Sequence, residues 1–195
     1  MDIYQIIITH NRSWTIREII AFAVVFLIAI FIAAILLRRQ KIRIMQAASC
    51  LVLLIFLAII FGSTVFTRTP GVRQYQLEVF WSWKEILKIG ECGRLGSGTG
   101  DGLLQENFLN ILLLLPVGFL LPGTFNRRLK WWQGLITGII VSSAIEVCQL
   151  VLCRGLFEFD DIIHNSLGCM LGTLAGDKLY QHFRNIASLK PGKRK

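Results

Sequence analysis

The sequence predicts an all-α protein, a polytopic helical bundle that crosses a membrane about five times. Apolar residues make up 54% of the 195 residues, and the mean hydropathy is positive. Long apolar runs alternate with short basic loops, which is typical of a single membrane domain, here residues 1–195. The net charge of +9 does not indicate a nucleic-acid partner, because Lys and Arg gather at the ends of the runs, where loops and lipid headgroups explain them.

The first two apolar runs predict the first two spans. Residues 19–37 are all apolar, which is longer than a secretory signal core, and no cleavage signal follows them. The basic cluster from Arg38 to Arg43 ends this run, and residues 47–66 form the second span.

Residues 67–106 form the longest polar segment. Within it, residues 77–89 have apolar groups at helical spacing, and two interpretations stay open: a helix lying in the membrane interface, or one packed on the end of the bundle. Residues 96–102, GSGTGDG, do not match a phosphate-binding glycine motif, and we expect a flexible connection there.

The remaining runs, 108–121, 134–152 and 162–180, predict spans three to five, and residues 184–195 a basic cytoplasmic tail. Lys and Arg are more numerous in loop 38–43, in loop 122–133 and beyond residue 178 than on the alternate side. We therefore expect the N-terminus outside and the C-terminus inside, in a multi-pass protein of the plasma membrane.

Polar residues whose insertion into a bilayer is unfavourable converge in the outer half of this bundle. Their convergence predicts an outward-facing polar pocket. They are Asn107, Asn110, Glu146, Gln149, Arg154, Asp160, Asp161 and Asn165. Small residues on the same faces, Gly168, Gly172 and Gly176, predict close helix packing in the inner half.

Structural interpretations of the polar residues compete with functional ones. The amides can simply join helices by hydrogen bonds, and Asp160 or Asp161 can cap a helix. Glu146 needs a partner such as Arg154 or must stay protonated. His164 has a metal-compatible spacing after the aspartates, but a lone histidine is usually structural, so we expect no metal and no cofactor. A Cys92–Cys153 disulfide on the outer side is left open.

Three segments resemble the VanZ-like family, membrane proteins named for one associated with teicoplanin resistance. They are RQYQLEVFWSW, ENFLNILLLLPVGFLLP and, most specifically, EVCQ followed by Arg154 and DDIIHNSLGCMLG. The resemblance covers residues 73–178 approximately. It departs from the family where Gln76, Glu78 and Val79 stand in a region that often has Asn and Pro.

The resemblance implies a multi-pass membrane protein that affects (lipo)glycopeptide susceptibility, and it implies no reaction. The leading hypothesis is a pocket that binds an envelope lipid, a lipid-linked precursor or the acyl chain of the antibiotic. A membrane enzyme is the first alternative, with Glu146 and Asp161 as acid and base and Arg154 holding a phosphate. A small transporter that carries protons on Glu146 is the second.

Overall fold

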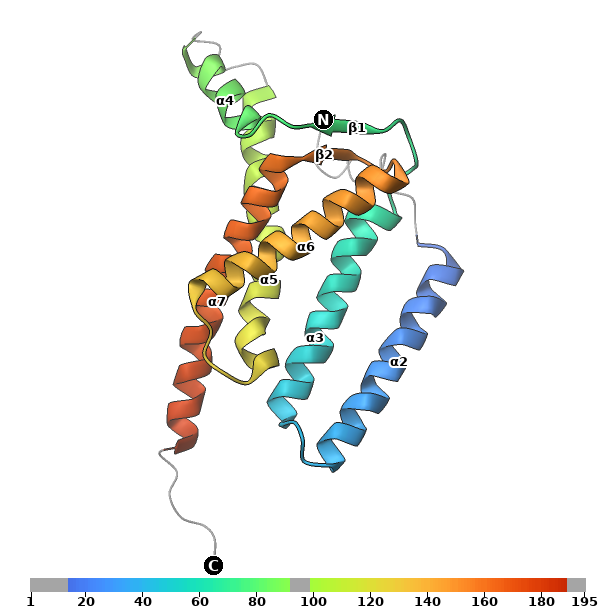
Figure 1. Cartoon of the computed structure of the whole chain (residues 1–195), viewed down its shortest axis with the longest axis vertical. Helices are drawn as coiled ribbons and strands as arrows, with labels where there is room; N and C mark the ends of the chain where they lie inside the picture. Colours follow the sequence, from blue (N-terminus) through green and yellow to red (C-terminus); the bar gives the residue numbers. More distant parts are fainter. Residues whose placement is uncertain (1–13, 92–98, 189–195) are drawn as a thin grey trace, which may run out of the picture.

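The computed structural model describes residues 14–91 and 99–188. The elements in chain order are α2 (Ile16–Arg38), α3 (Ile44–Phe61), the π-helix η1 (Gly62–Phe66), β1 (Gln74–Gln76), α4 (Trp81–Glu91), α5 (Thr99–Phe125), α6 (Trp131–Leu152), β2 (Leu156–Glu158) and α7 (Phe159–Ser188). The five long helices run in alternating directions (Figure 1). We call the end that carries β1, β2 and the start of α7 the strand end, and the opposite end, with the α2–α3 and α5–α6 loops, the loop end.

Four helical segments of the described chain are long and apolar enough to cross a membrane: Ile16–Arg38, Ile44–Phe66, Asp101–Phe125 and Trp131–Leu152. This supports the predicted membrane bundle. Helix α7 contains the fifth predicted run but is not among the four. It packs against both α5 and α6, so much of its surface meets protein, where a less apolar sequence is tolerated.

Helices α5 and α7 form the most extensive contact of the bundle. Three glycines of α7 lie against three carbonyl groups of α5 at the same four-residue spacing: Gly168 by Ile111, Gly172 by Leu115 and Gly176 by Phe119. A methyl group at Gly168 would lie only 1.8 Å from the Ile111 oxygen. Any side chain here would therefore push the two helices apart.

A proline in α5 leaves a backbone carbonyl that α7 then contacts. Pro122 has no N–H, so the carbonyl of Gly118, four residues earlier, lacks its intrahelical donor. The buried hydroxyl of Thr173 lies 3.3 Å from this carbonyl and 2.8 Å from that of Cys169. The polar interruption in α5 is thus covered by a polar group of its neighbour.

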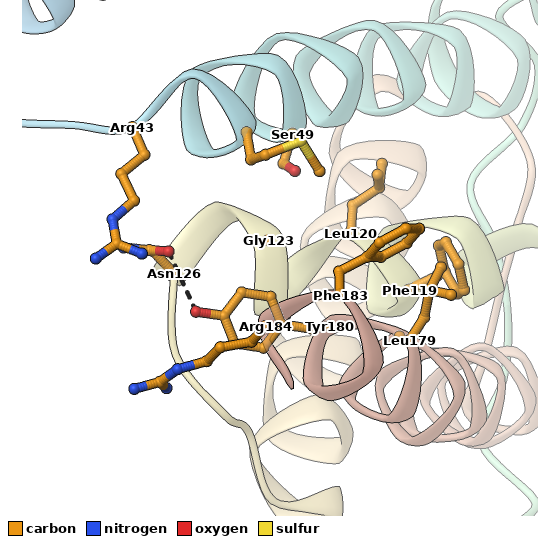
Figure 2. Close-up of a pocket in the computed structure, with 12 residues that line it drawn as sticks. Arg43, Ser49, Phe119, Leu120, Gly123, Asn126, Leu179, Tyr180, Phe183 and Arg184 are labelled. Atoms are coloured by element: carbon orange, nitrogen blue, oxygen red, sulfur yellow. Dashed lines mark hydrogen bonds between the residues drawn. The ribbon is translucent and has the colours of Figure 1, made fainter. Parts of the chain in front are cut away.

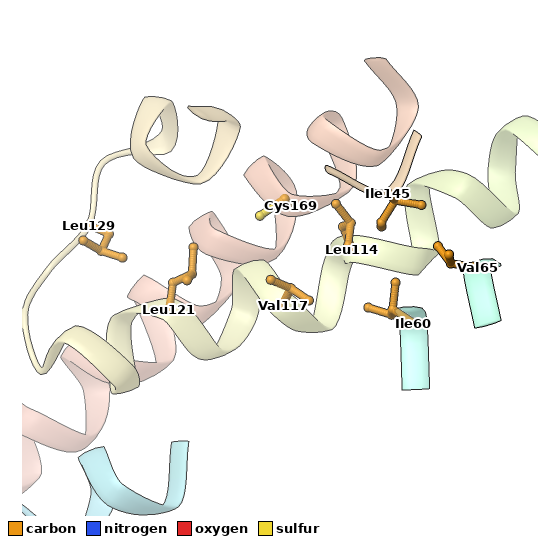
Figure 3. Close-up of a cluster of buried hydrophobic side chains, with 8 residues drawn as sticks. All are labelled: Ile60, Val65, Leu114, Val117, Leu121, Leu129, Ile145 and Cys169. Atoms are coloured by element: carbon orange, nitrogen blue, oxygen red, sulfur yellow. The ribbon is translucent and has the colours of Figure 1, made fainter. Parts of the chain in front are cut away.

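Figure 3 shows the apolar core, which runs along α5 and joins it to α3, η1, α6 and α7. Its buried members are Ile60, Val65, Leu114, Val117, Leu121, Leu129, Ile145 and Cys169. Helix α2 stands outside this core: it packs on α3, and none of its residues is buried. Its apolar side chains are therefore available to lipid.

Two predicted boundaries in the polar segment are wrong. Helix α4 starts at Trp81 and not at residue 77, because Phe80 adopts a left-handed backbone conformation (φ 59°) that a helix cannot include. Helix α5 starts at Thr99, so residues 99–102 are helical where a flexible connection was expected, with Asp101 in the first turn complementing the helix dipole. Residues 96–98 lie outside the described residues.

The structure also contains a strand pair that the sequence did not predict. β1 and β2 pair in parallel, with Gln74 opposite Leu156, Tyr75 opposite Phe157 and Gln76 opposite Glu158. Each strand has three residues, too few for an alternating pattern to be recognised. The pair ties the segment after η1 to the start of α7.

Gly168→Ala should destabilise the bundle, because the added methyl group collides with the α5 backbone. Overpacking costs about 1–3 kcal/mol, and about 1 kcal/mol shifts Tm by roughly 2–4 °C for this chain length. We expect the Tm of the purified protein in detergent to fall by roughly 2–12 °C. Gly102→Ala is the matched control: nothing lies within 4 Å of its added carbon, and Tm should hold or rise slightly.

Candidate functional site

The strand end gathers the predicted polar side chains and packs most of them inside the protein. The exposed fraction is 5% or less for Asn107, Glu146, Gln149, Asp160 and Asn165. We call these residues, with Asn110, Asp161 and Glu158, the strand-end cluster. Burial of so many polar groups is favourable only where they have hydrogen-bond partners, and hydrogen bonds between different elements provide partners for most of them.

Asp160 fixes the start of α4. Its carboxylate accepts hydrogen bonds from Phe80 N (2.5 Å), from Ser82 N (3.1 Å) and from Ser82 Oγ (2.6 Å). Asn107 of α5 donates to the same Ser82 Oγ at 3.2 Å. Asp160, a residue of α7, therefore acts as the N-cap of α4, because Phe80 at the cap position has no side-chain acceptor. A carboxylate also complements the helix dipole at this N-terminus.

Three further hydrogen bonds join the helices around this point. Asn110 of α5 donates to Asp161 of α7 at 2.6 Å. Glu146 of α6 accepts from the backbone N–H of Glu158 in β2 at 3.0 Å. Asn165 Nδ2 donates to the Ser142 hydroxyl of α6 at 2.9 Å. The cluster therefore connects α5, α6, β2 and α7 at one level of the bundle.

Among the described residues, it is the charge of Arg68 rather than that of Arg154 that acts on the acidic groups of the cluster. Arg154 donates from its guanidinium to the Phe66 carbonyl at 2.9 Å, at the end of η1, where helical carbonyls lack partners. The charge of Arg68 acts on both Glu146 and Asp161. Sequence reasoning counted Arg68 only as a loop charge, although its place directly after the second apolar run was a usable signal.

A glycine gives Arg68 its space. Gly155 has a positive φ of 135°, and a side-chain carbon there would lie 2.6 Å from the Arg68 guanidinium. The same carbon would lie 3.3 Å from Gln149 Oε1, so the guanidinium and this amide flank one glycine. The π-helix η1 holds the other end of the same amide, because the Thr64 carbonyl accepts a hydrogen bond from Gln149 Nε2 at 3.1 Å.

Glu158 is an acid that the sequence reasoning missed. It lies in β2, outside the candidate spans, and is 6% exposed. Burial, together with repulsion from the carboxylates of Asp161 and Glu106, raises its pKa to about 8. A carboxyl group with this pKa is mostly protonated at neutral pH and can donate a hydrogen bond.

Two buried acceptors of the cluster have no hydrogen-bond partner in the described residues. They are Gln149 Oε1 and Asn165 Oδ1. Unsatisfied buried amide oxygens are unfavourable by about 1–3 kcal/mol each. Together with Arg68 they give the cluster unused capacity to contact a polar ligand.

His164 is engaged in packing α4. Its Nε2 accepts a hydrogen bond from the indole N–H of Trp83 at 2.9 Å, so α4 is attached to the bundle through its first turn. Among the described side chains, His, Cys, Asp and Glu form no group of three that could hold a metal ion. Cys153 has a free thiol, and Cys92, its suggested partner, lies outside the described residues.

Asp160→Ala should release α4, because Phe80 N, Ser82 N and Ser82 Oγ lose their shared acceptor. A hydrogen bond to a charged group contributes about 1.5–3 kcal/mol, so amide exchange at Ser82 should accelerate by roughly 10- to 100-fold. Hydrogen exchange read by mass spectrometry measures this. Asp101→Ala, at an exposed helix start, is the control, and unchanged protection at Ser82 in Asp160→Ala would contradict the capping role.

The native stability should fall as pH rises, in part through Glu158. Its ordinary pKa is 4.5 and its native pKa about 8, so between these values the folded protein keeps a proton that the unfolded chain loses. Stability therefore decreases across this interval and levels off above it. In Glu158→Gln the decrease of Tm between pH 5 and pH 8 should be shallower, whereas the exposed Glu85→Gln control should keep the native slope. Equal slopes would refute the assignment.

Comparison with known proteins gives one match. A family model described as VanZ/LLP1 matches residues 44–177. The matched range begins with α3 and ends within α7, so it includes the whole strand-end cluster and omits the peripheral α2. No curated protein and no solved structure matches the chain significantly.

Proposed function

The chain belongs to the VanZ/LLP1 family, and from this premise we propose that it is a plasma-membrane protein acting on (lipo)glycopeptide susceptibility. The strand-end cluster binds the polar part of an envelope lipid, of a lipid-linked precursor or of the antibiotic itself. The observation that carries the proposal is that the guanidinium of Arg68 and the amide of Gln149 flank Gly155, while the amide oxygens of Gln149 and Asn165 have no hydrogen-bond partner in the described residues.

The chemistry of the cluster suits a ligand that has both an anionic group and hydrogen-bond donors. A guanidinium binds phosphate or carboxylate oxygens with strong, charge-assisted hydrogen bonds. Gln149 Oε1 and Asn165 Oδ1 accept from hydroxyl or amide N–H groups, which sugars and peptides provide. Phospholipid headgroups, lipid-linked wall precursors and glycopeptides all contain this combination.

In the proposed orientation the strand end faces outward, and α7 is the fifth span. The basic loops then lie on the cytoplasmic side, as the positive-inside rule expects. Glycopeptides act on wall precursors outside the membrane, so an outward cluster would meet them there. Because the cluster is covered by residues 74–87, a ligand reaches it only when the Asp160 contacts to α4 open.

An enzyme remains the second candidate, favoured by one observation. The carboxyl group of Glu158 has a pKa raised to about 8 by burial and by repulsion from the Asp161 carboxylate, and general acid/base chemistry uses such interacting carboxyl groups. If the protein is an enzyme, Arg68 binds the phosphate of a lipid-linked substrate, and the substrate undergoes hydrolysis or group transfer.

Arg68→Gln should abolish the protein's effect on teicoplanin susceptibility in a sensitive host. The substitution removes the guanidinium that binds the anionic group of the ligand in this proposal. Loss of one charged contact, about 1.5–3 kcal/mol, weakens ligand binding roughly 10- to 100-fold. The minimal inhibitory concentration should then equal that of the host alone, while the Glu85→Gln control keeps the native value.

Membrane insertion of each variant is checked by the yield of monodisperse protein in detergent. Native susceptibility with a properly inserted Arg68→Gln protein would refute the binding proposal. Mass spectrometry of the envelope lipids from the same strains separates the two candidates: an unchanged lipid profile, with susceptibility altered, contradicts the enzyme.

A further inference from the structure

A concave feature lies at the loop end, far from the strand-end cluster. It is a pocket of 340 Å³ between the start of α3, the end of α5 and the end of α7. Residues from all three helices line it, among them Arg43, Ser49, Phe119, Leu120, Phe183 and Arg184. Neither the predicted site nor the proposed function uses these residues.

The pocket has two chemically distinct sides. Figure 2 shows the rings of Phe119 and Phe183 on one side and the guanidinium groups of Arg43 and Arg184 on the other. Between the two arginines the hydroxyl of Tyr180 donates to Asn126 Oδ1 at 3.1 Å, which holds the end of α7 to the α5–α6 loop. An apolar chain with an anionic head would match both sides at once.

The charge around the pocket favours such an anion. The loop end carries Arg38, Arg39, Lys41, Arg43, Arg127, Arg128, Lys130, Lys178 and Arg184. In loops 39–43 and 126–130 and in segment 177–188, the described chain has a single acidic residue, Asp177, which is buried and engaged by Leu129 N, Gln181 and Arg128. Basic pockets between transmembrane helices at the cytoplasmic interface attract anionic lipid headgroups.

We propose that this pocket binds an anionic phospholipid of the inner leaflet. One acyl chain lies on Phe119, Leu120 and Phe183, and the phosphate is bound by Arg43 and Arg184. Arginine suits this role because its planar guanidinium can donate two parallel hydrogen bonds to phosphate oxygens. The lipid joins α3 to α5 and α7 at the end where no strand pair connects them.

Binding is measured on the full chain in detergent by native mass spectrometry, with dioleoyl phosphatidylglycerol as the probe and dioleoyl phosphatidylcholine for comparison. We expect preference for phosphatidylglycerol in the native protein. A basic residue near an anionic headgroup contributes about 1 kcal/mol, or about fivefold in affinity. The double variant Arg43→Gln/Arg184→Gln should therefore bind roughly 25-fold more weakly.

Arg38→Gln/Arg39→Gln is the matched control, since it removes the same charge from the same end but from outside the pocket. Its affinity should change less than twofold. Dihexanoyl phosphatidylglycerol tests the apolar side and should bind more weakly than the long-chain lipid.

Four outcomes would overturn the proposal. Equal binding of the two headgroups, or equal weakening by the control pair, would remove the role of the two pocket arginines. Displacement of the lipid by glycerol phosphate as readily as by phosphatidylglycerol would make the site a phosphate site. A dimer that only the pocket substitutions dissociate would make the pocket an interface between two copies.

Discussion

The structure depends above all on the close approach of α5 and α7. Glycines at four-residue spacing on α7 place its backbone directly on the carbonyl groups of α5, and this contact sets the axial register of the two helices. This register determines which polar groups meet at the strand end. Asn110 donates to Asp161, and Asn107 donates to the Ser82 hydroxyl, which in turn donates to Asp160. A shift by one turn, about 5.4 Å, would separate all of these pairs.

Polar groups in a membrane protein are tolerated where protein surrounds them, and α7 illustrates this. It carries the two aspartates, His164 and Asn165 in its first half, yet it lies against both α5 and α6. Its neighbours supply donors for the carboxylates, and the chain after η1 adds the backbone N–H groups of Phe80 and Ser82. Helix α2, which has the highest hydropathy of the four candidate spans, takes the opposite position, at the periphery.

The features that the sequence predicted well are those that depend on local periodicity. The length of the apolar runs located the helices of the bundle. What depends on tertiary contact was not predictable. The start of α4 is set by a carboxylate far along the chain. β1 and β2 form only by pairing with each other, and the guanidinium of Arg68 fits beside Gln149 because Gly155 leaves room for it. The assumption that Arg154 serves Glu146 came from closeness in sequence, whereas its actual acceptors belong to η1.

The parallel pairing of β1 with β2 has a consequence for the order of folding. The two strands flank α4, α5 and α6 in the chain, so their hydrogen bonds cannot form before all three helices have been synthesised and placed. Contacts of such long range form late, because the entropy of closing the large loop must be overcome first. Until then Asp160 at the start of α7 lacks its contacts with α4, and β2 lacks its pairing with β1. The nascent bundle remains open at the strand end.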